Sequence, residues 1–243
     1  MIEKRARWGW TGALLASGIG GITGSTLLSL VSGQVSLYVP RPIQIVLMVV
    51  VLYFAIVVHE VSHGFVANLR GDPTAKRLGR LTLNPIPHID IFGSIIIPGF
   101  LILTNAGFVI GWAKPVPIDI RRFRDPLGDF AITSLAGPAS NVIQGLIYVG
   151  LFHAASAFAS PGWVLFLAYI GALINFILAI FNMIPIPPLD GSRLVAALLP
   201  TDLAVQYLSI ERFGFIIIFG LLWLGAFRVV FGAAQDILHA LLG

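Results

Sequence analysis

The sequence contains no cysteine, and only 11% of its 243 residues are Asp, Glu, Lys or Arg. Without cysteine there are neither disulfide bridges nor thiolate metal ligands. A soluble domain carries about 25% charged residues, so 15 basic and 11 acidic side chains cannot cover a water-facing surface of this size. Because 57% of the residues are hydrophobic and the mean hydropathy is +0.93, the composition predicts an integral membrane protein.

Internal repeats and low-complexity segments are also missing, and the connections between apolar stretches are too short to house a soluble domain. We therefore expect residues 1–243 to form a single membrane-embedded domain. Its core is predicted at 42–193, with peripheral helices at 1–41 and 200–243. The N-terminus begins basic and then stays apolar for more than 20 residues. That length favours a retained anchor helix over a cleaved signal peptide.

Apolar stretches of the roughly 20 residues needed to cross a bilayer occur at 10–32, 42–66, 130–157 and 163–183. A last apolar segment begins at Phe213 and is interrupted by Arg228. This arginine either extends toward the membrane interface or marks a break between two short helices. The sequence thus predicts an all-α polytopic membrane protein with five or six transmembrane helices, and it leaves open whether 213–243 crosses once or twice.

The apolar segment at 91–113 is followed by a basic cluster, Lys114, Arg121, Arg122 and Arg124. If this segment crossed the membrane, the cluster would lie outside, whereas Lys and Arg favour the cytoplasmic side. The β-branched runs and the mid-segment Pro-Gly pair also suit strands. We therefore predict a re-entrant, partly β hairpin at 91–118. Because such backbone must be buried in protein or line a wet cavity, the hairpin implies a cavity.

The sequence "HEVSH", residues 59–63, ends an apolar stretch without charge from 42 to 58. At helical spacing His59 and His63 share one face, and Glu60 lies about 100° away. This pattern is typical of a zinc site in which two imidazoles bind the ion and the carboxylate reaches a water molecule. Ionisable groups inside a membrane span are costly and usually functional, so the motif predicts an active site toward the cytoplasmic face.

A catalytic zinc ion needs a third protein ligand, and three side chains are candidates: His88, Asp90 and Asp190. The prolines around 185–188 force an extended segment, whose free carbonyl groups need partners. A carboxylate fixed in this way favours Asp190, while Asp90 is expected to pair with an arginine or cap a turn. His153 and His239 are expected to be packed or interfacial histidines.

Five motifs, "HEVSH", "GDPTAKRLGRLTLNPIPHID", "GWAKPVPI", "LAGPASN" and "NMIPIPPLDGSR", occur in this order over residues 59–193. Together they resemble the site-2 protease family of intramembrane zinc metalloproteases, in its compact form without a PDZ or nucleotide-sensing domain. The resemblance implies that one zinc ion is bound by His59, His63 and Asp190. It also implies that Glu60 is the catalytic carboxylate, and that Asn141 faces the active site as an oxyanion or substrate contact.

These features predict a zinc metalloendopeptidase that cuts peptide bonds within or near transmembrane segments. Its expected partners are a transmembrane protein substrate and the lipid bilayer of the cell (plasma or inner) membrane, with no nucleic acid. The oligomeric state does not follow from the sequence. An ion transporter, for zinc or another ion, is the alternative, because transporters also place histidines and acids at mid-membrane. Against a transporter, the sequence has no internal repeat. A catalytically silent scaffold is a further alternative. Hydrolysis requires the Glu60 carboxylate, whereas neither transport nor a silent scaffold does.

Overall fold

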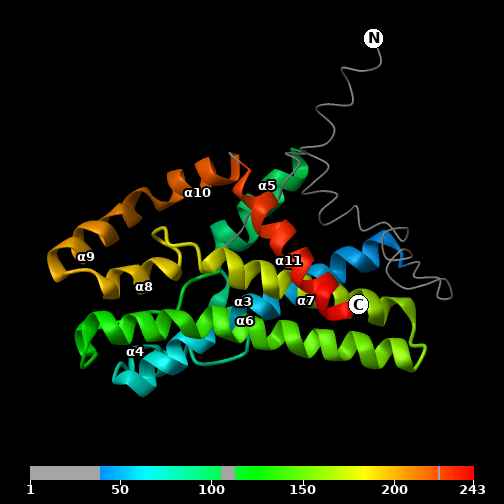
Figure 1. The fold of residues 1–243 in the computed structure, drawn as a ribbon, viewed down its shortest axis with the longest axis horizontal. Helices are drawn as coiled ribbons and strands as arrows, with labels where there is room; N and C mark the ends of the chain where they lie inside the picture. The colour runs from blue at the N-terminus through cyan, green and yellow to red at the C-terminus, as the bar shows by residue number, and fades with distance from the viewer. Residues whose placement is uncertain (1–38, 105–112, 224) are drawn as a thin grey trace, which may run out of the picture.

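The computed structural model describes residues 39–104, 113–223 and 225–243, and every regular element in these ranges is helical. Three of these helices are long and apolar enough to cross a membrane: α3 (Arg41–Arg70), α6 (Pro126–Ala157) and α7 (Gly162–Asn182). They pack against one another and run along the long axis of the molecule (Figure 1). Three predicted spans are thereby found as helices, while the span predicted at 10–32 lies outside the described residues.

Local signals in the sequence set the ends of the two helices that carry polar motifs. α6 begins where the Asp125 side chain accepts a hydrogen bond from the Gly128 N–H, and proline occupies the first helical position. Both features stabilise a helix N-terminus. α3 ends at Gly71, whose φ of 113° suits glycine, and the Asp72 N–H closes the last turn on Ala67 O at 2.9 Å. This is the left-handed termination that commonly ends helices.

The α6–α7 interface is close because glycines on each helix face aromatic rings on the other. A Cβ atom on Gly145 would lie 2.8 Å from Phe176 Cε1, and one on Gly171 would lie 2.6 Å from Tyr148 Cγ. Small residues of this kind let helix backbones approach within a membrane. α7 is the most buried of the three helices, and it contributes most of the hydrophobic core, including Leu165, Phe166, Ile170 and Leu173.

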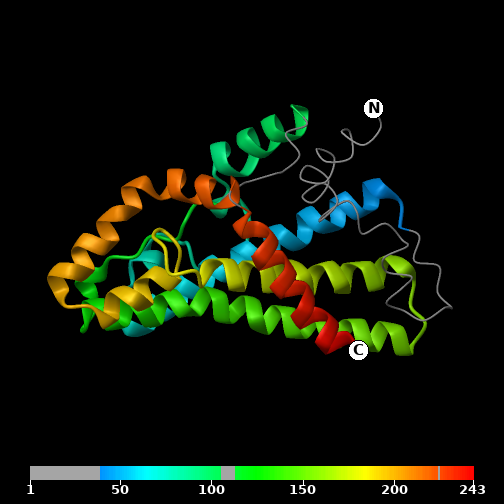
Figure 2. The same cartoon turned by 45° about the horizontal axis from the view of Figure 1, so that its top comes forward.

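Shorter helices complete the described chain. Between α3 and α6 lie α4 (Thr74–Arg77), η1 (Ile86–His88), η2 (Ile91–Ile96), α5 (Ile97–Leu103) and η3 (Ile120–Arg122). After α7 come α8 (Gly191–Leu198), α9 (Thr201–Leu208), η4 (Ser209–Phe213), α10 (Gly214–Trp223) and α11 (Ala226–Leu242). α8, α9 and α10 form an arc beside the bundle, and α11 crosses back over α7 (Figures 1 and 2).

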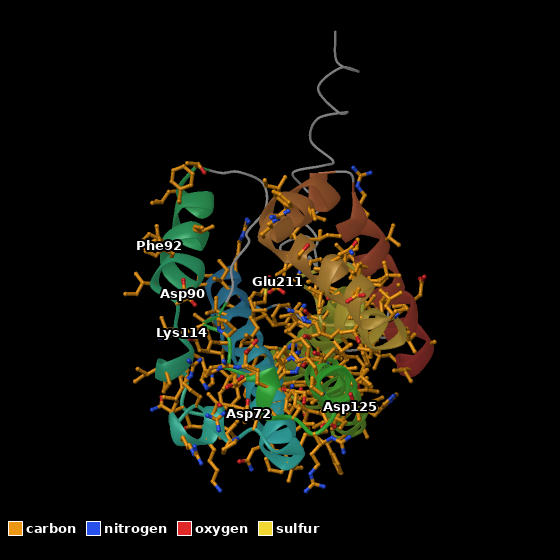
Figure 3. All side chains as sticks on the ribbon, turned by 90° about the vertical axis from the view of Figure 1, so that its left-hand side faces the viewer. Asp72, Asp90, Phe92, Lys114, Asp125 and Glu211 are labelled. Atoms are coloured by element: carbon orange, nitrogen blue, oxygen red, sulfur yellow. The ribbon has the colours of Figure 1, made fainter. Side chains whose placement is uncertain are left out.

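The predicted partly β hairpin at 91–118 is not confirmed. Its described beginning is helical, with a π-helical turn in η2 that continues into α5. Asp90 starts this helix because its Oδ1 accepts a hydrogen bond from the Gly93 N–H at 2.7 Å, and this local cap outweighs the strand preference of the β-branched residues. η2 and α5 stand apart from the bundle, as Asp90 and Phe92 show in Figure 3. Residues 105–112 of the predicted hairpin are not described.

The last apolar segment is broken close to the interrupting arginine. α10 and α11 are separated around Gly225, whose φ is 90°, and Arg228 lies in the first turn of α11. At 1.5 Å per residue, α10 spans about 15 Å and α11 about 26 Å. Each of the two helices is therefore shorter than the roughly 30 Å hydrocarbon core of a bilayer.

Candidate metal centre

α3 brings two imidazoles together in the interior of the bundle. His59 and His63 are both buried, and their Nε2 atoms lie 3.0 Å apart. The rings meet edge to face, with centroids 4.6 Å apart. The i, i+4 spacing puts both side chains on the same face of the helix, so the predicted pairing of the two histidines is present in the structure.

The loop between α7 and α8 supplies a carboxylate at the same point. Asp190 Oδ2 lies 3.2 Å from His59 Nε2 and 3.3 Å from His63 Nε2. Among the described residues, these three side chains are the group that could hold a metal ion. The fold thus brings together side chains from a long helix and from a proline-rich loop. In the sequence, Asp190 lies 127 positions after His63.

The distances within this group suit a tetrahedral zinc ion. Zinc binds imidazole nitrogen and carboxylate oxygen at about 2.0–2.2 Å, so neighbouring ligand atoms of a regular tetrahedron are separated by about 3.3–3.5 Å. The three observed separations of 3.0, 3.2 and 3.3 Å are close to this value. The three side chains therefore fit the ion that the sequence predicts, and they leave a fourth position for water or substrate.

Hydrogen bonds on the far side of each imidazole define which nitrogen faces the centre. His63 Nδ1 lies 2.8 Å from the backbone oxygen of Thr133, which can only accept, so Nδ1 carries the proton. His59 Nδ1 lies 2.6 Å from Asn141 Oδ1. Asn141 Nδ2 donates to Ala55 O, which fixes the amide so that Oδ1 is the acceptor. Both Nε2 atoms of neutral imidazoles then present lone pairs to the centre.

The centre is consequently rich in electrons and requires a cation. Two nitrogen lone pairs face a carboxylate oxygen, and within the described part of the chain Asp190 Oδ2 is buried without a hydrogen-bond partner. An ionised carboxylate beside two imidazole lone pairs is the donor set that zinc binds.

One face of α6 forms the wall behind the imidazoles. Thr133, Gly137 and Asn141 follow one another at intervals of four residues, so they line one side of the helix. Gly137, the middle residue of these three, lies at the tips of both imidazoles. An added Cβ there would lie 2.6 Å from His59 Nε2 and would also collide with His63 Nε2. Pro138 lacks an N–H and disturbs the helical hydrogen bonding of this turn, next to the Thr133 carbonyl that holds His63.

Glu60 lies next to the convergent group and is held by a non-helical segment. Its Oε2 accepts a hydrogen bond from the Val116 N–H at 2.8 Å. Val116 stands between Pro115 and Pro117, so it provides the single backbone N–H of residues 115–117. Because a residue that precedes proline is restricted to extended conformations, this short segment presents its one N–H to Glu60 from a rigid backbone.

Both ends of that segment, residues 114–119, are attached to the polar end of α3. The Lys114 carbonyl accepts a hydrogen bond from Arg80 Nη2 at 2.8 Å. At the other end, the Asp119 N–H donates to Asp72 Oδ2 at 2.7 Å, and Asp72 is fully buried. Arg121 beside Asp119 donates to its carboxylate and holds the pKa of that group below its ordinary value. The position of Glu60 therefore depends on a segment anchored just beyond the end of its own helix.

The other candidate side chains lie outside the centre. His88 is fully buried with Nε2 3.0 Å from Thr82 O, and Asp90 caps η2 as its predicted turn-capping role requires. His153 Nε2 lies 2.9 Å from the Leu241 carbonyl and so links α6 to α11. His239 is exposed on α11. Of the three candidates for the third ligand, Asp190 alone joins the histidines.

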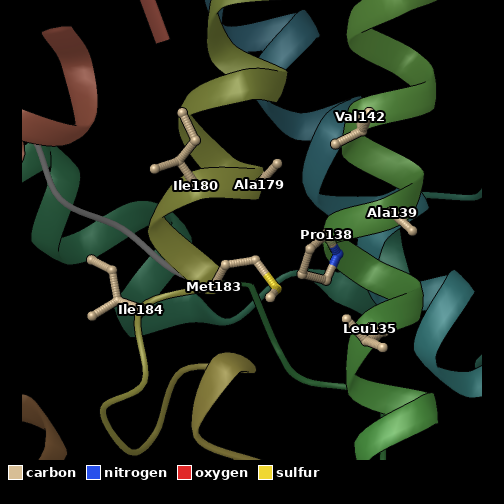
Figure 4. A pocket seen from close by; sticks show the side chains of 8 residues that line it. All are labelled: Leu135, Pro138, Ala139, Val142, Ala179, Ile180, Met183 and Ile184. Carbon is tan, nitrogen blue, oxygen red and sulfur yellow. The ribbon is translucent and has the colours of Figure 1, made fainter. Parts of the chain in front are cut away.

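An apolar groove runs between α6 and α7 beside the centre (Figure 4). Its volume is about 470 Å³, and it is lined by Leu135, Pro138, Ala139, Val142, Ala179, Ile180, Met183 and Ile184. Pro138 directly follows Gly137 at the imidazole tips. The backbone of Met183 and Ile184 lies against Gly191, which directly follows Asp190. The groove thus adjoins residues next to the centre: Gly137 on α6, and Gly191 at the start of α8.

Two residues of the site are absent from the sequence-based prediction. Thr133 acts through its backbone carbonyl, for which a side-chain pattern contains no signal. Gly137 acts through its missing side chain, and its only trace in the sequence is a small residue four positions before Asn141. Asn175 connects α7 to α6, since its Oδ1 accepts a hydrogen bond from Asn141 Nδ2 at 2.8 Å.

The close approach of Gly137 to both imidazoles can be tested by adding a side chain at this position. We expect Gly137→Ala to weaken zinc binding by at least about tenfold, a change of the size seen when groups that orient metal ligands are altered. Gly150→Ala on the same helix is the matched control, since a Cβ there meets no atom within 4 Å. Alanine is favoured over glycine in a helix in both variants. Zinc titration of the purified proteins measures the effect, and equal affinities in the two variants would refute this geometry.

Comparisons with known proteins address what such a centre does. The family model described as Peptidase family M50 matches residues 148–224, which include Asp190. "Putative zinc metalloprotease YwhC" of Bacillus subtilis is 40% identical over 179 residues, covering 70% of this chain and 77% of that protein. "Putative zinc metalloprotease Rip2" of Mycolicibacterium smegmatis is 30% identical over 168 residues, covering 68% of this chain and 61% of that protein. No solved structure gives a significant match.

The likeness to a relative at 40% identity over most of both sequences extends far beyond a short metal-binding motif. It confirms the resemblance to site-2 proteases and the predicted use of zinc, and it gives no support to an ion transporter. The chain belongs to peptidase family M50 and is a membrane-associated zinc metallopeptidase.

Proposed function

We propose that this metallopeptidase is an intramembrane endopeptidase, which hydrolyses peptide bonds within or near the transmembrane segments of other membrane proteins. The observation that carries the proposal is the position of the metal centre. His59 lies 11 residues before the end of α3, or about 16 Å along the helix axis, and α3 is apolar enough to span a membrane. Chemistry at this depth acts on peptide bonds that soluble proteases do not reach.

The proposed ligands are His59 Nε2, His63 Nε2 and a carboxylate oxygen of Asp190. Zinc, when bound, supplies Lewis-acid chemistry that polarises a carbonyl group and makes water a better nucleophile near neutral pH. Thr133 and Asn141 hold the two imidazoles by their Nδ1 atoms, so that neither ring can rotate its lone pair away from the centre. Such outer contacts fix the tautomer and orientation of metal-binding histidines.

Glu60 is the proposed general base and acid. Its Oε2 is occupied by the Val116 N–H, so we assign proton transfer to Oε1. This oxygen takes a proton from the attacking water and later delivers it to the nitrogen of the departing amine. A hydrogen bond from Val116 to the other oxygen keeps the carboxylate from rotating between these two steps.

Asn141 is predicted to contact the oxyanion or the substrate, but its hydrogen bonds favour an orienting role. The side chain is fully buried. Its Nδ2 donates to Ala55 O at 3.3 Å and to Asn175 Oδ1 at 2.8 Å, which uses both amide hydrogens. We therefore propose that Asn141 acts on His59 in the resting enzyme, and a contact with substrate would require it to leave these partners.

We propose that the metal centre lies toward the cytoplasmic side of the cell membrane. The polar end of α3 and the beginning of α6 are adjacent, as the hydrogen bond from Arg70 Nε to Asp129 Oδ1 at 2.6 Å indicates. The basic residues Lys76, Arg77, Arg121, Arg122 and Arg124 gather in the connections at this same end. Lys and Arg in short loops favour the cytoplasm, which supports this orientation.

Replacing the proposed general base separates catalysis from metal binding. Glu60→Gln should lower the rate of cleavage of a single-pass membrane substrate by at least about 100-fold, the lower end of what general acid–base catalysis contributes. Zinc content should remain that of the wild type, because Glu60 is not among the converging ligands. Cleavage assays in detergent micelles and metal analysis of the same samples measure both. Normal cleavage by this variant would disprove the mechanism.

The two competing aspartates give a paired test of the ligand set. Asp190→Ala should lose zinc, because it removes one of three ligand atoms. Asp90→Ala should keep zinc, since Asp90 caps η2 outside the centre, although the lost cap is expected to cost about 1 kcal/mol of stability. The opposite pattern of zinc content would show that the wrong carboxylate has been assigned.

The single N–H of residues 115–117 allows a test of how Glu60 is held. Val116→Pro removes that N–H, and we expect kcat to fall about tenfold or more, since a hydrogen bond to a charged group contributes about 1.5–3 kcal/mol. Val116→Ala truncates the same buried side chain but keeps the N–H, and it should lose much less activity. Zinc content should be unchanged in both variants. Equal kcat values for the two would mean that the N–H does not orient Glu60.

A further inference from the structure

The loop that carries Asp190 has few hydrogen-bond donors of its own. Residues 183–190 contain Pro185, Pro187 and Pro188, and the peptide bond between the last two is cis. Proline provides no N–H, so this backbone cannot satisfy its carbonyl groups as a helix would. Side chains of α8 and α9 supply partners for the carbonyl groups of Pro185, Pro188 and Leu189.

A tyrosine of α9 holds the beginning of the loop. The Tyr207 hydroxyl donates to the Pro185 carbonyl with an O···O distance of 2.6 Å. α9 reaches this position because the arc of α8 and α9 folds back beside the end of α7 (Figure 1). The contact is between elements that are 22 residues apart, so it reflects tertiary packing rather than a local turn.

An arginine holds the end of the loop next to the ligand. Arg193 Nη1 donates to the Pro188 carbonyl and, at 2.9 Å, to the Leu189 carbonyl. The opposite edge of the same guanidinium, Nη2, donates to Glu211 Oε2 of η4 at 3.1 Å. Arg193 therefore connects the two residues that precede Asp190 to the C-terminal part of the chain. The planar donor array of arginine permits such simultaneous contacts.

Two further contacts lock this arrangement. The Arg193 guanidinium lies over the Phe130 ring of α6, 5.5 Å from its centroid, which attaches it to the bundle. At the start of α10, a Cβ on Gly214 would lie 3.0 Å from Pro188 Cγ, so the glycine allows α10 to pack directly against the loop. The loop is thus held between α6 on one side and residues 207–214 on the other.

We propose that residues 201–214, the C-terminal arm, are a positioning device for the metal ligand Asp190, with Tyr207 and Glu211 as the positioning residues. The arm acts through the carbonyl groups of Pro185, Pro188 and Leu189, and it contributes no ligand of its own. The inference rests on the proposed role of Asp190 in zinc binding. The sequence predicts that residues 200–243 form peripheral helices. In this proposal, part of that region instead supports the metal centre.

The test measures zinc binding by purified full-length protein in detergent, with zinc itself as the probe. Tyr207→Phe and Glu211→Gln remove one hydroxyl and one charge from the arm. We expect each to accelerate zinc loss to a chelator about threefold or more, and the double variant at least tenfold, in line with the effect of groups that orient metal ligands. Wild-type rates in the double variant would overturn the inference.

Two matched controls remove the same chemical groups elsewhere. Tyr53→Phe deletes a hydroxyl that lies 3.4 Å from the Pro85 carbonyl, in a loop without a proposed ligand. Asp236→Asn neutralises an exposed carboxylate of α11, outside the arm. Both controls should release zinc at the wild-type rate. If they release it as fast as the arm variants, the effect reflects general destabilisation, and the positioning role is rejected.

Unfolding measurements distinguish positioning from simple structural support. In zinc-free protein the arm variants should unfold close to the wild-type temperature, whereas the stabilisation gained on adding zinc should be smaller. A lower unfolding temperature without zinc and an unchanged zinc-induced shift would contradict the proposal.

Asp190→Ala serves as the reference: if it keeps zinc, the ligand set itself is wrong. If it loses zinc while the arm variants keep it, only the positioning inference fails.

Discussion

The mutual approach of two imidazole nitrogens and one carboxylate oxygen is the constraint on which the rest of the structure depends. His59 Nε2, His63 Nε2 and Asp190 Oδ2 lie 3.0–3.3 Å from one another in a buried position. Hydrogen bonds to Nδ1 point the lone pairs of both rings inward, so without a cation the three atoms repel each other. A cation bound here would relieve this repulsion, so the zinc binding that we propose for this centre would also stabilise the fold.

Polar contacts join the three spanning helices next to the metal centre. A chain of hydrogen bonds runs from His59 on α3 to Asn141 on α6 and on to Asn175 on α7, whose Nδ2 donates to Gly171 O at 2.9 Å. Asn141 also returns to α3 through the Ala55 carbonyl. In an apolar surrounding each unpaired group would be costly, so this network fixes the rotation of the helices relative to one another. The chain that orients one imidazole thereby also sets the packing of the bundle.

The sequence predicts the helical half of the site better than the non-helical half. The i, i+4 histidines and the apolar runs of α3, α6 and α7 follow from helical periodicity and hydropathy, and the structure has all three helices. Choosing Asp190 over Asp90 and His88 required the order of several motifs. The roles of Thr133 and Gly137 could not be identified. Thr133 acts through a backbone carbonyl, and Gly137, although part of the motif "LAGPASN", acts through the side chain that it lacks. The β-branched runs and the basic cluster that follows them predict a re-entrant, partly β hairpin at 91–118, yet its described beginning is a helix that starts at the Asp90 cap.

The two carboxylates of the centre are held differently from the two imidazoles. The histidines belong to a long helix buried in the bundle, and α6 fixes their outer nitrogens. Glu60 is set by an extended segment anchored at Arg80 and Asp72 beyond the end of α3. Asp190 is on a proline-rich loop held by Arg193 and the C-terminal arm. In Figure 3, Lys114 of the first support lies at the edge near Asp90, and Glu211 of the second lies nearer the middle of the view.

This division has a physical consequence for the enzyme. Helices packed in a bundle resist displacement, whereas an extended segment and a loop depend on a few hydrogen bonds near the surface, where opening costs less free energy. A displacement of either support would move a carboxylate without moving the imidazole pair. With the proposed ligand set, a shift of Glu60 alone would leave the three ligand atoms in place, whereas a shift of Asp190 would also weaken zinc binding.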